Sequence, residues 1–196
     1  MDSLPLYEMM ISDDHASDLE VTAIAMVDNP AIEKNWFAFK ENKAPMNFAA
    51  IDEDEHLIVG PAMIPDLKIY RSDEQMGEYN VVFSKQTVCK IAEKFYAKGF
   101  QGNANIMHDE GQVVQGVNYF LSFIKDTAKG MVGMAGEYPE GTWFVGARVA
   151  NPEVWAKIKS GEIKGFSVEG IFQYSLPKTE DEKLFDKIKE ILNGIK

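Results

Sequence analysis

Cysteine is almost absent from this chain of 196 residues, which has only Cys89. A single cysteine excludes an internal disulfide and fits a reducing compartment. Long apolar runs are missing too, since none approaches the roughly 20 residues that a membrane-spanning helix requires. The first residues lack the basic and then apolar pattern of a signal peptide. We therefore expect a soluble, intracellular protein that is not secreted and has no membrane partner.

Basic residues are scarce relative to acidic ones. The chain has 20 Lys and Arg against 31 Asp and Glu, which gives a net charge of −11. Because phosphate binding needs a basic face, this balance argues against a nucleic-acid partner. The apolar fraction of 45% and the aromatic fraction of 11% are typical of a packed globule rather than a disordered chain.

Histidine is also scarce, and its order along the chain is informative. All three histidines, His15, His56 and His108, precede Ser167, which lies in the pattern G-x-S-x-x-G. In α/β-hydrolases the base follows the nucleophile and the pattern is G-x-S-x-G, so that class is excluded. A serine hydroxyl needs a base to remove its proton before it attacks a carbonyl. His108 is the candidate base, because the other two histidines lie in polar or acidic segments.

A metal site is the other functional interpretation of His108. It is followed by Asp109 and Glu110, but one histidine with two adjacent acids lacks the spaced ligands of a zinc site. We therefore expect neither a metal nor another cofactor.

The pattern of the chain predicts three parts: an N-terminal arm over residues 1–50, a main domain over 51–178 and an amphipathic C-terminal helix over 179–196. In the arm, the alternation from Val21 to Val27 indicates a strand. In the main domain, strand signals are interrupted by few helices, and residues 163–174 are predicted as one strand carrying Ser167. This order is typical of an α+β or closed-barrel fold rather than of βαβ units.

Two helices of the main domain have clear start signals. Ser84 is a predicted N-cap, followed by apolar residues at helical spacing and closed by Gly99. Asn151-Pro152-Glu153 combines a capping side chain, a proline in the first turn and an acid near the positive end of the helix dipole.

Several short motifs, in the same order, resemble the XkdF-type phage serine proteases. That family is related to the prohead maturation proteases of tailed phages and, more distantly, to herpesvirus assemblins. The resemblance covers roughly residues 57–175, and the leader loosely resembles that of such proteins in crAss-like phages. The motifs that carry it are residues 59–66, 69–71, 79–84, 103–109, 141–143, 153–155 and 160–170, with 4–8 and 28–33 in the leader.

The resemblance implies an assemblin-like β-barrel flanked by helices, with a catalytic serine and histidine at Ser167 and His108. It also implies that scaffold protein and major capsid protein are substrates, inside the procapsid in the host cytoplasm, and that the protein forms a homo-oligomer. Herpesvirus relatives use a second histidine after the serine. This chain has none there, so an acid serves as the third residue or the site is a dyad.

Glu169, Asp109 and Asp126 are the candidate acids. Glu169 is two residues from Ser167, so the two side chains leave a strand on the same face; this favours Glu169. Glycines near the serine let the backbone approach a peptide closely and offer N–H groups to an oxyanion. We expect the oxyanion donors near Gly165 and Val168.

These observations lead to the hypothesis of a serine endopeptidase that matures the prohead by cleaving scaffold and capsid proteins, and itself as a further candidate. One alternative is a catalytically silent procapsid or scaffold interaction protein with the same fold. A second alternative is an esterase or amidase of another fold.

Overall fold

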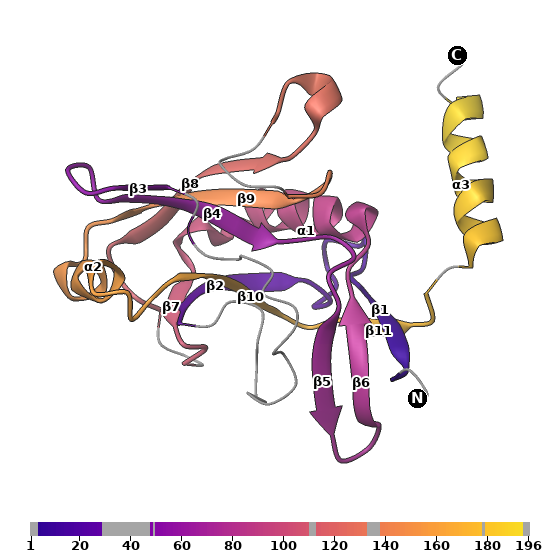
Figure 1. Ribbon diagram of the computed structural model, residues 1–196, viewed down its shortest axis with the longest axis horizontal. Helices are drawn as coiled ribbons and strands as arrows, with labels where there is room; N and C mark the ends of the chain where they lie inside the picture. Colours follow the sequence, from indigo (N-terminus) through magenta and orange to yellow (C-terminus); the bar gives the residue numbers. More distant parts are fainter. Residues whose placement is uncertain are drawn as a thin grey trace.

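The computed structural model of the chain describes residues 4–28, 48, 50–109, 113–132, 138–177 and 179–193 (Figure 1). Its strands are β1 (Leu6–Met10), β2 (Val21–Val27), β3 (Ala50–Asp52), β4 (Leu57–Met63), β5 (Ile69–Asp73), β6 (Gly77–Val82), β7 (Ala104–Ile106), β8 (Val117–Ile124), β9 (Trp143–Val149), β10 (Gly165–Gly170) and β11 (Gln173–Ser175). Its helices are α1 (Lys85–Ala97), α2 (Pro152–Lys159) and α3 (Glu180–Asn193), with short 3₁₀ turns at Phe100–Gly102 and Thr127–Lys129. Strands dominate, which confirms the predicted α+β class.

The strands form three separately hydrogen-bonded sheets, in the orders β11-β1-β6-β5, β10-β2-β7 and β3-β4-β9-β8. Strand β10 of the second sheet lies close to β4 of the third. No sheet closes on itself within the described ranges, so the predicted closed barrel is not confirmed. Large side chains fill the space between the sheets and α1, and the fully buried ones include Trp143, Phe95, Phe166 and Ile24.

Both main-domain helices begin as the sequence predicts, and α1 also ends as predicted. Ser84 caps α1, because its Oγ accepts a hydrogen bond from the backbone N–H of Thr87 (3.3 Å). Asn151 caps α2 in the same way, with its Oδ1 accepting from the N–H groups of Glu153 and Val154. Gly99, with φ of 77°, adopts the left-handed backbone that follows a helix end.

The strand predicted over residues 163–174 is wrong in its length. The structure divides it into β10 and β11, with a register shift between Glu169 and Gly170. At Gly170 the backbone comes so close to the backbone of Glu20 that a Cβ would clash with the Glu20 carbonyl oxygen. The chain then leaves β2 and, as β11, pairs with β1 in another sheet. Glycine permits this close crossing, and the crossing ends the strand.

The segment predicted as an N-terminal arm supplies strands to two sheets. Strand β1 lies between β11 and β6, and β2 lies between β10 and β7. The β2 strand itself is confirmed at the predicted residues, 21–27. The domain boundaries expected at residues 50 and 178 stay a prediction.

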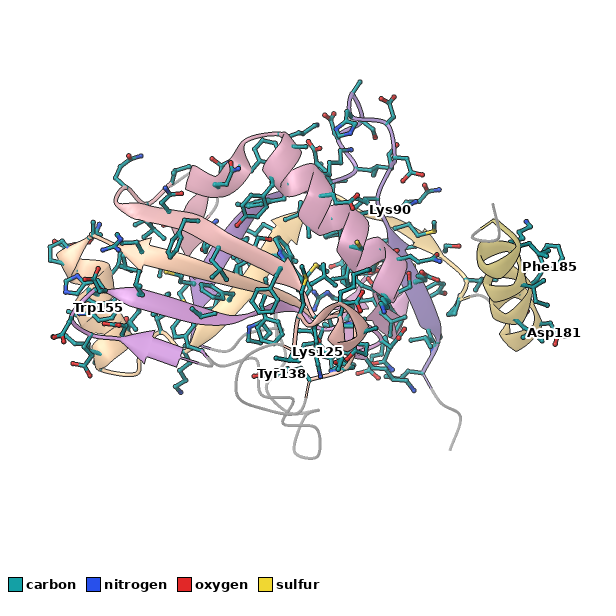
Figure 2. The ribbon with its side chains drawn as sticks, turned by 90° about the horizontal axis from the view of Figure 1, so that it is seen from above. Lys90, Lys125, Tyr138, Trp155, Asp181 and Phe185 are labelled. Atoms are coloured by element: carbon teal, nitrogen blue, oxygen red, sulfur yellow. The ribbon has the colours of Figure 1, made fainter. Side chains whose placement is uncertain are left out.

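Helix α3 confirms a helix in the C-terminal segment, up to the last described residue. In both views it stands apart from the sheets, with Asp181 and Phe185 on its surface, whereas α1 lies across the strands (Figures 1 and 2). Leu184, Phe185 and Leu192 are each more than half exposed. No helix in the described parts of the chain is long and apolar enough to cross a membrane.

Candidate active site

The three-stranded sheet aligns the candidate residues in one row. Ala25 at the centre of β2 pairs with Ser167 on β10 and with Asn105 on β7. Residues directly opposite each other in a sheet point to the same face, as do residues two apart along a strand. Ser167, Glu169 and Asn105 therefore share a face with Ala23 and Ala25. The small alanine side chains leave room above β2 for larger side chains to meet.

His108 reaches this face from the turn that follows β7. Met107 and His108 have φ values of 54° and 57°, in the left-handed region that side chains other than glycine seldom adopt. The turn is held by hydrogen bonds from the Met107 N–H to the Met26 carbonyl and from the Asp109 N–H to the Ile106 carbonyl, both 3.1 Å. Such a backbone conformation persists only where the surroundings enforce it, and it is common at functional sites.

Glu169 holds both His108 and Asn105. Its Oε1 lies 2.6 Å from Nδ1 of His108 and accepts a hydrogen bond from Nδ2 of Asn105 at 2.7 Å. Exposed fractions of 18% for the histidine side chain and 22% for the glutamate place this pair at the edge of the protein interior. We call Ser167, His108, Glu169 and Asn105 the serine cluster.

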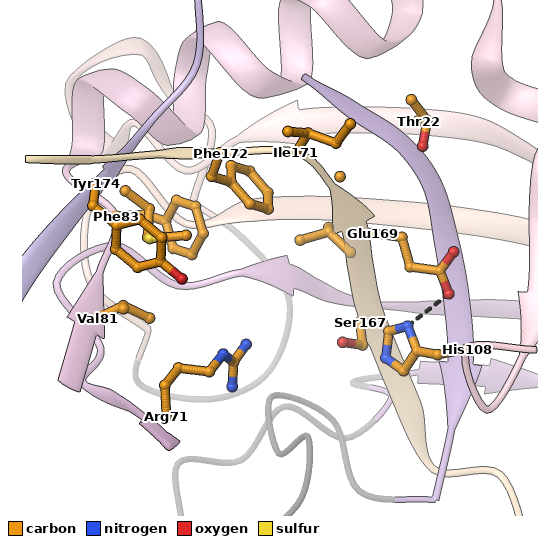
Figure 3. A pocket seen from close by; sticks show the side chains of 13 residues that line it. Thr22, Arg71, Val81, Phe83, His108, Ser167, Glu169, Ile171, Phe172 and Tyr174 are labelled. Carbon is orange, nitrogen blue, oxygen red and sulfur yellow. Dashed lines mark hydrogen bonds and ion pairs between the residues drawn. The ribbon is translucent and has the colours of Figure 1, made fainter. Parts of the chain in front are cut away.

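The serine cluster borders a cavity of about 490 Å³ that Ser167, His108, Glu169 and Arg71 help to line. Figure 3 shows the His108 ring between the Glu169 carboxylate and Ser167, with its second nitrogen on the side of Ser167. The Arg71 guanidinium points into the cavity from the opposite wall (Figure 3). The serine hydroxyl is therefore accessible to a substrate, and the imidazole has its acid partner on the far side.

Buried phenols support the walls around the cavity. The Tyr119 hydroxyl donates to the carbonyl of Ile24 in β2 (2.9 Å), and burial raises the pKa of Tyr119 well above its usual range. Burial, followed by hydrogen bonds with Tyr174 and Asp73, likewise raises the pKa of Tyr79 far above its ordinary value. Both phenols stay protonated at physiological pH and act as fixed donors.

The other candidates from the sequence fall at different places. Val168 lines the cavity beside Ser167, whereas Gly165 pairs with Val27 and is not among the described residues that line it. Asp109 is exposed, and Asp126 pairs with Lys129 at 2.7 Å, outside the serine cluster. Of the three candidate acids, Glu169 is the one bonded to Nδ1 of His108. No group of three or more His, Cys, Asp or Glu that could hold a metal gathers within the described ranges.

Asn105 was missed as a site residue. It is 6% exposed and is a polar residue in a short strand between two apolar neighbours. A polar residue inside an otherwise apolar strand was the sequence signal that could have marked Asn105 as a site residue. Its role depends on the pairing of β7 with β2, which the sequence did not reveal.

This arrangement has the parts required for nucleophilic acyl chemistry. A serine lies on a cavity wall, an imidazole lies beside it, and a carboxylate bonds the imidazole nitrogen remote from the serine. A carboxylate at Nδ1 favours the histidine tautomer with its proton on Nδ1, in which Nε2 is the proton acceptor, and it stabilises the imidazolium that forms. The proton on the His108 ring is assigned to Nδ1 from the hydrogen bond of that nitrogen with Glu169.

The part of the chain that matches a known family includes His108, Ser167 and Glu169. A family model described as "Putative phage serine protease XkdF" matches residues 46–175. "Uncharacterized protein YqbD" of Bacillus subtilis (strain 168) is 24% identical over 189 residues, which cover 89% of this chain and 54% of that protein. The chain thus spans about half the length of this curated relative. No solved structure matches the chain.

Proposed function

The chain belongs to the XkdF family of phage proteins, and from this premise we propose that it is a serine endopeptidase with Ser167 as nucleophile. The single observation that carries the proposal is the short contact between His108 Nδ1 and Glu169 Oε1 on the same cavity wall as Ser167. A histidine oriented by a carboxylate and placed next to an accessible serine is the constellation that activates a hydroxyl.

In the proposed mechanism, Nε2 of His108 takes the proton of the Ser167 hydroxyl as the oxygen attacks the carbonyl carbon of the scissile peptide. The imidazolium then gives this proton to the leaving amine, which departs and leaves an acyl group on Ser167. A water molecule, deprotonated by the same imidazole, hydrolyses the acyl-enzyme. Glu169 stays ionised and stabilises the imidazolium, and Asn105 fixes the position of Glu169.

Backbone N–H groups near Gly165 and Val168 are the proposed oxyanion donors. Strand β10 is the outer strand of its three-stranded sheet, which supports this role because an edge strand presents unpaired backbone groups to a bound peptide. The assemblin-like relationship of the fold is part of the same proposal. It is supported by the close approach of β10, the outer strand of its sheet, to β4 of the third sheet.

The proposed substrates are the scaffold protein and the major capsid protein, cleaved inside the procapsid in the host cytoplasm, and the enzyme itself is a further substrate candidate. A homo-oligomeric state belongs to this proposal as well. Support comes from the phage family to which the chain belongs.

The test is co-expression with the cognate scaffold and capsid proteins, followed by mass spectrometry of the products. We expect the unaltered chain to cleave them and to react with a fluorophosphonate that labels active serines. Ser167→Ala should abolish both, because removal of the nucleophile of a triad costs on the order of 10⁶-fold in kcat. Ser160→Ala is the matched control, since Ser160 is an exposed residue that bonds the Lys157 carbonyl at the end of α2.

Normal processing by Ser167→Ala would overturn the proposal. If neither protein is cleaved, no serine is labelled over a range of enzyme concentrations, and capsid protein co-purifies with the chain, the silent interaction protein is the correct alternative. Hydrolysis of small esters as fast as peptides would instead favour an esterase.

A further inference from the structure

Arg71 is a cation on the cavity wall that the proposed mechanism does not use. It lies on β5, in a different sheet from Ser167, and its guanidinium enters the cavity opposite the serine cluster (Figure 3). One of its N–H donors bonds the carbonyl of Tyr70 at 3.1 Å. A guanidinium has five N–H donors in a planar fork, so this bond orients the group and leaves donors for a ligand.

The two arginines of the chain have different surroundings. Arg148 pairs with Glu55 at 3.1 Å, and both side chains are more than half exposed. No carboxylate of the described residues lies within ion-pair distance of Arg71. Among the described residues that line the larger cavity, the one carboxylate is that of Glu169, which His108 and Asn105 hold at the other side (Figure 3). Arg71 is therefore the permanent positive charge among the described residues that line this cavity.

An apolar cavity of about 60 Å³ adjoins the first one at Arg71 and Ser167, which line both. Its walls include Met63, Leu67 and Phe172. A cavity needs roughly 10–15 Å³ to hold one water, so this one has space for a short aliphatic chain. An apolar wall beside a guanidinium lowers the local dielectric constant and strengthens its attraction for a carboxylate.

We propose that Arg71 and this apolar cavity form a subsite that selects an acidic side chain, Asp or Glu, close to the scissile bond of a peptide substrate. The methylene groups of the acidic residue lie along the apolar wall, and its carboxylate accepts hydrogen bonds from the guanidinium. The inference rests on the proposed peptidase activity of Ser167 and names the substrate class for that site.

A role in stabilising the oxyanion is the other task that Arg71 could perform in this cavity. The two roles have different kinetic signatures. Oxyanion stabilisation accelerates every substrate alike, whereas a carboxylate subsite accelerates acidic substrates over their amide counterparts.

The experiment profiles cleavage of a proteome-derived peptide library by mass spectrometry. Matched peptides with Glu or Gln at the enriched position are then assayed. We expect kcat/KM to be about 10- to 100-fold higher for the Glu peptide, as for a charge-assisted hydrogen bond. Arg71→Met should remove this preference, because kcat/KM for the Glu peptide falls to the value for the Gln peptide. Arg71→Glu should shift the preference towards Lys, and Arg148→Met is the matched control that keeps the preference for Glu.

Equal losses for Glu and Gln peptides in Arg71→Met, or no acidic preference in the unaltered enzyme, would overturn the subsite. Failure of the peptidase proposal gives a separate result, because fluorophosphonate labelling of Ser167 is then absent. In that case binding of hexapeptide pools containing one Glu or one Gln is measured by calorimetry on Ser167→Ala. Tighter binding of the Glu pool, lost in Ser167→Ala/Arg71→Met, supports the subsite, and equal binding refutes it.

Discussion

Two glutamates of this protein, Glu169 and Glu20, each hold two partners, but in regions with different exposure to solvent. Glu169 bonds His108 and Asn105 on the wall of an open cavity, and 22% of its side chain is exposed. Glu20 pairs with Lys94 at 3.4 Å and with Lys98 at 2.5 Å, and 6% of its side chain is exposed. The first glutamate lines an open cavity, and the second is buried between a loop and a helix.

The region around Glu20 fastens the connection between β1 and β2 to α1. Nζ of Lys94 lies 2.8–3.5 Å from the backbone carbonyls of Ser12, Asp14, Ser17 and Leu19. We call Lys94, Lys98, Glu20 and residues 12–19 the lysine cluster. An ammonium group has three donors, so these carbonyls and the carboxylate satisfy it fully.

The difference in exposure predicts that the serine cluster serves chemistry and that the lysine cluster serves the fold. Within the lysine cluster, the side chains of Lys94 and Glu20 are each only 6% exposed, so removing either of them should destabilise the fold. The serine cluster leaves one side open to the cavity, so changes there should lower activity at nearly constant stability. The predictions below separate these two outcomes, beginning with the largest effect.

Glu169→Gln should lower kcat about 10⁴-fold, the size of loss found when the acid of a serine protease triad becomes an amide. The neutral amide neither stabilises the imidazolium nor enforces its tautomer. Peptide cleavage and fluorophosphonate labelling measure the loss, and the thermal midpoint should stay close to that of the unaltered protein. Glu162→Gln is the control, because Glu162 is an exposed partner of Lys157. A fall in stability with little loss of activity would show instead that Glu169 stabilises the fold, as Glu20 does.

Lys94→Met should reduce the free energy of unfolding by about 3–5 kcal/mol, as expected when one partner of a buried ion pair is removed. The carbonyls of the loop and the Glu20 carboxylate would lose their shared donor. Urea denaturation followed by circular dichroism measures the change. The folded fraction should keep its kcat, and a loss of kcat at unchanged stability would contradict this assignment.

Asn105→Ala should lower kcat by about 10- to 100-fold, because it removes one hydrogen bond to a charged group. Glu169 would remain ionised but less firmly positioned. KM should change little, since Asn105 is not one of the described residues that line the cavity. Steady-state kinetics separate the two constants, and an effect confined to KM would assign Asn105 to substrate binding.

Lys90→Met should change the free energy of unfolding by no more than about 1 kcal/mol, as is usual for an exposed ion pair. Lys90 lies one turn before Lys94 on α1 and pairs with Asp13 at 2.7 Å, with exposed fractions of 50% and 75%. It is thus the matched control for Lys94→Met. A destabilisation as large as that of Lys94→Met would show that burial does not separate the two lysines.

Much of the local structure was accessible from the sequence. The caps at Ser84 and Asn151 act within three residues of themselves, so they predicted both helix starts. The strand 163–174 was predicted too long, because its end depends on the approach of Gly170 to the backbone of Glu20, 150 residues earlier in the chain. The barrel expected from the family resemblance is not confirmed in the described part of the chain. Closure of a barrel depends on pairing between strand edges, which no local pattern encodes.

For the candidate site too, some features were predictable from the sequence and others were not. The alternation of side chains along a strand was enough to place Ser167 and Glu169 on one face, because that periodicity is a property of extended backbone. The contact of Glu169 with His108, the part played by Asn105 and the position of Arg71 across the cavity depend on strands far apart in the chain. They follow from Ala25 pairing with both β10 and β7, and from the β5–β6 hairpin facing that sheet. Such long-range register is set by the packing of the whole core, so it became visible only in the folded molecule.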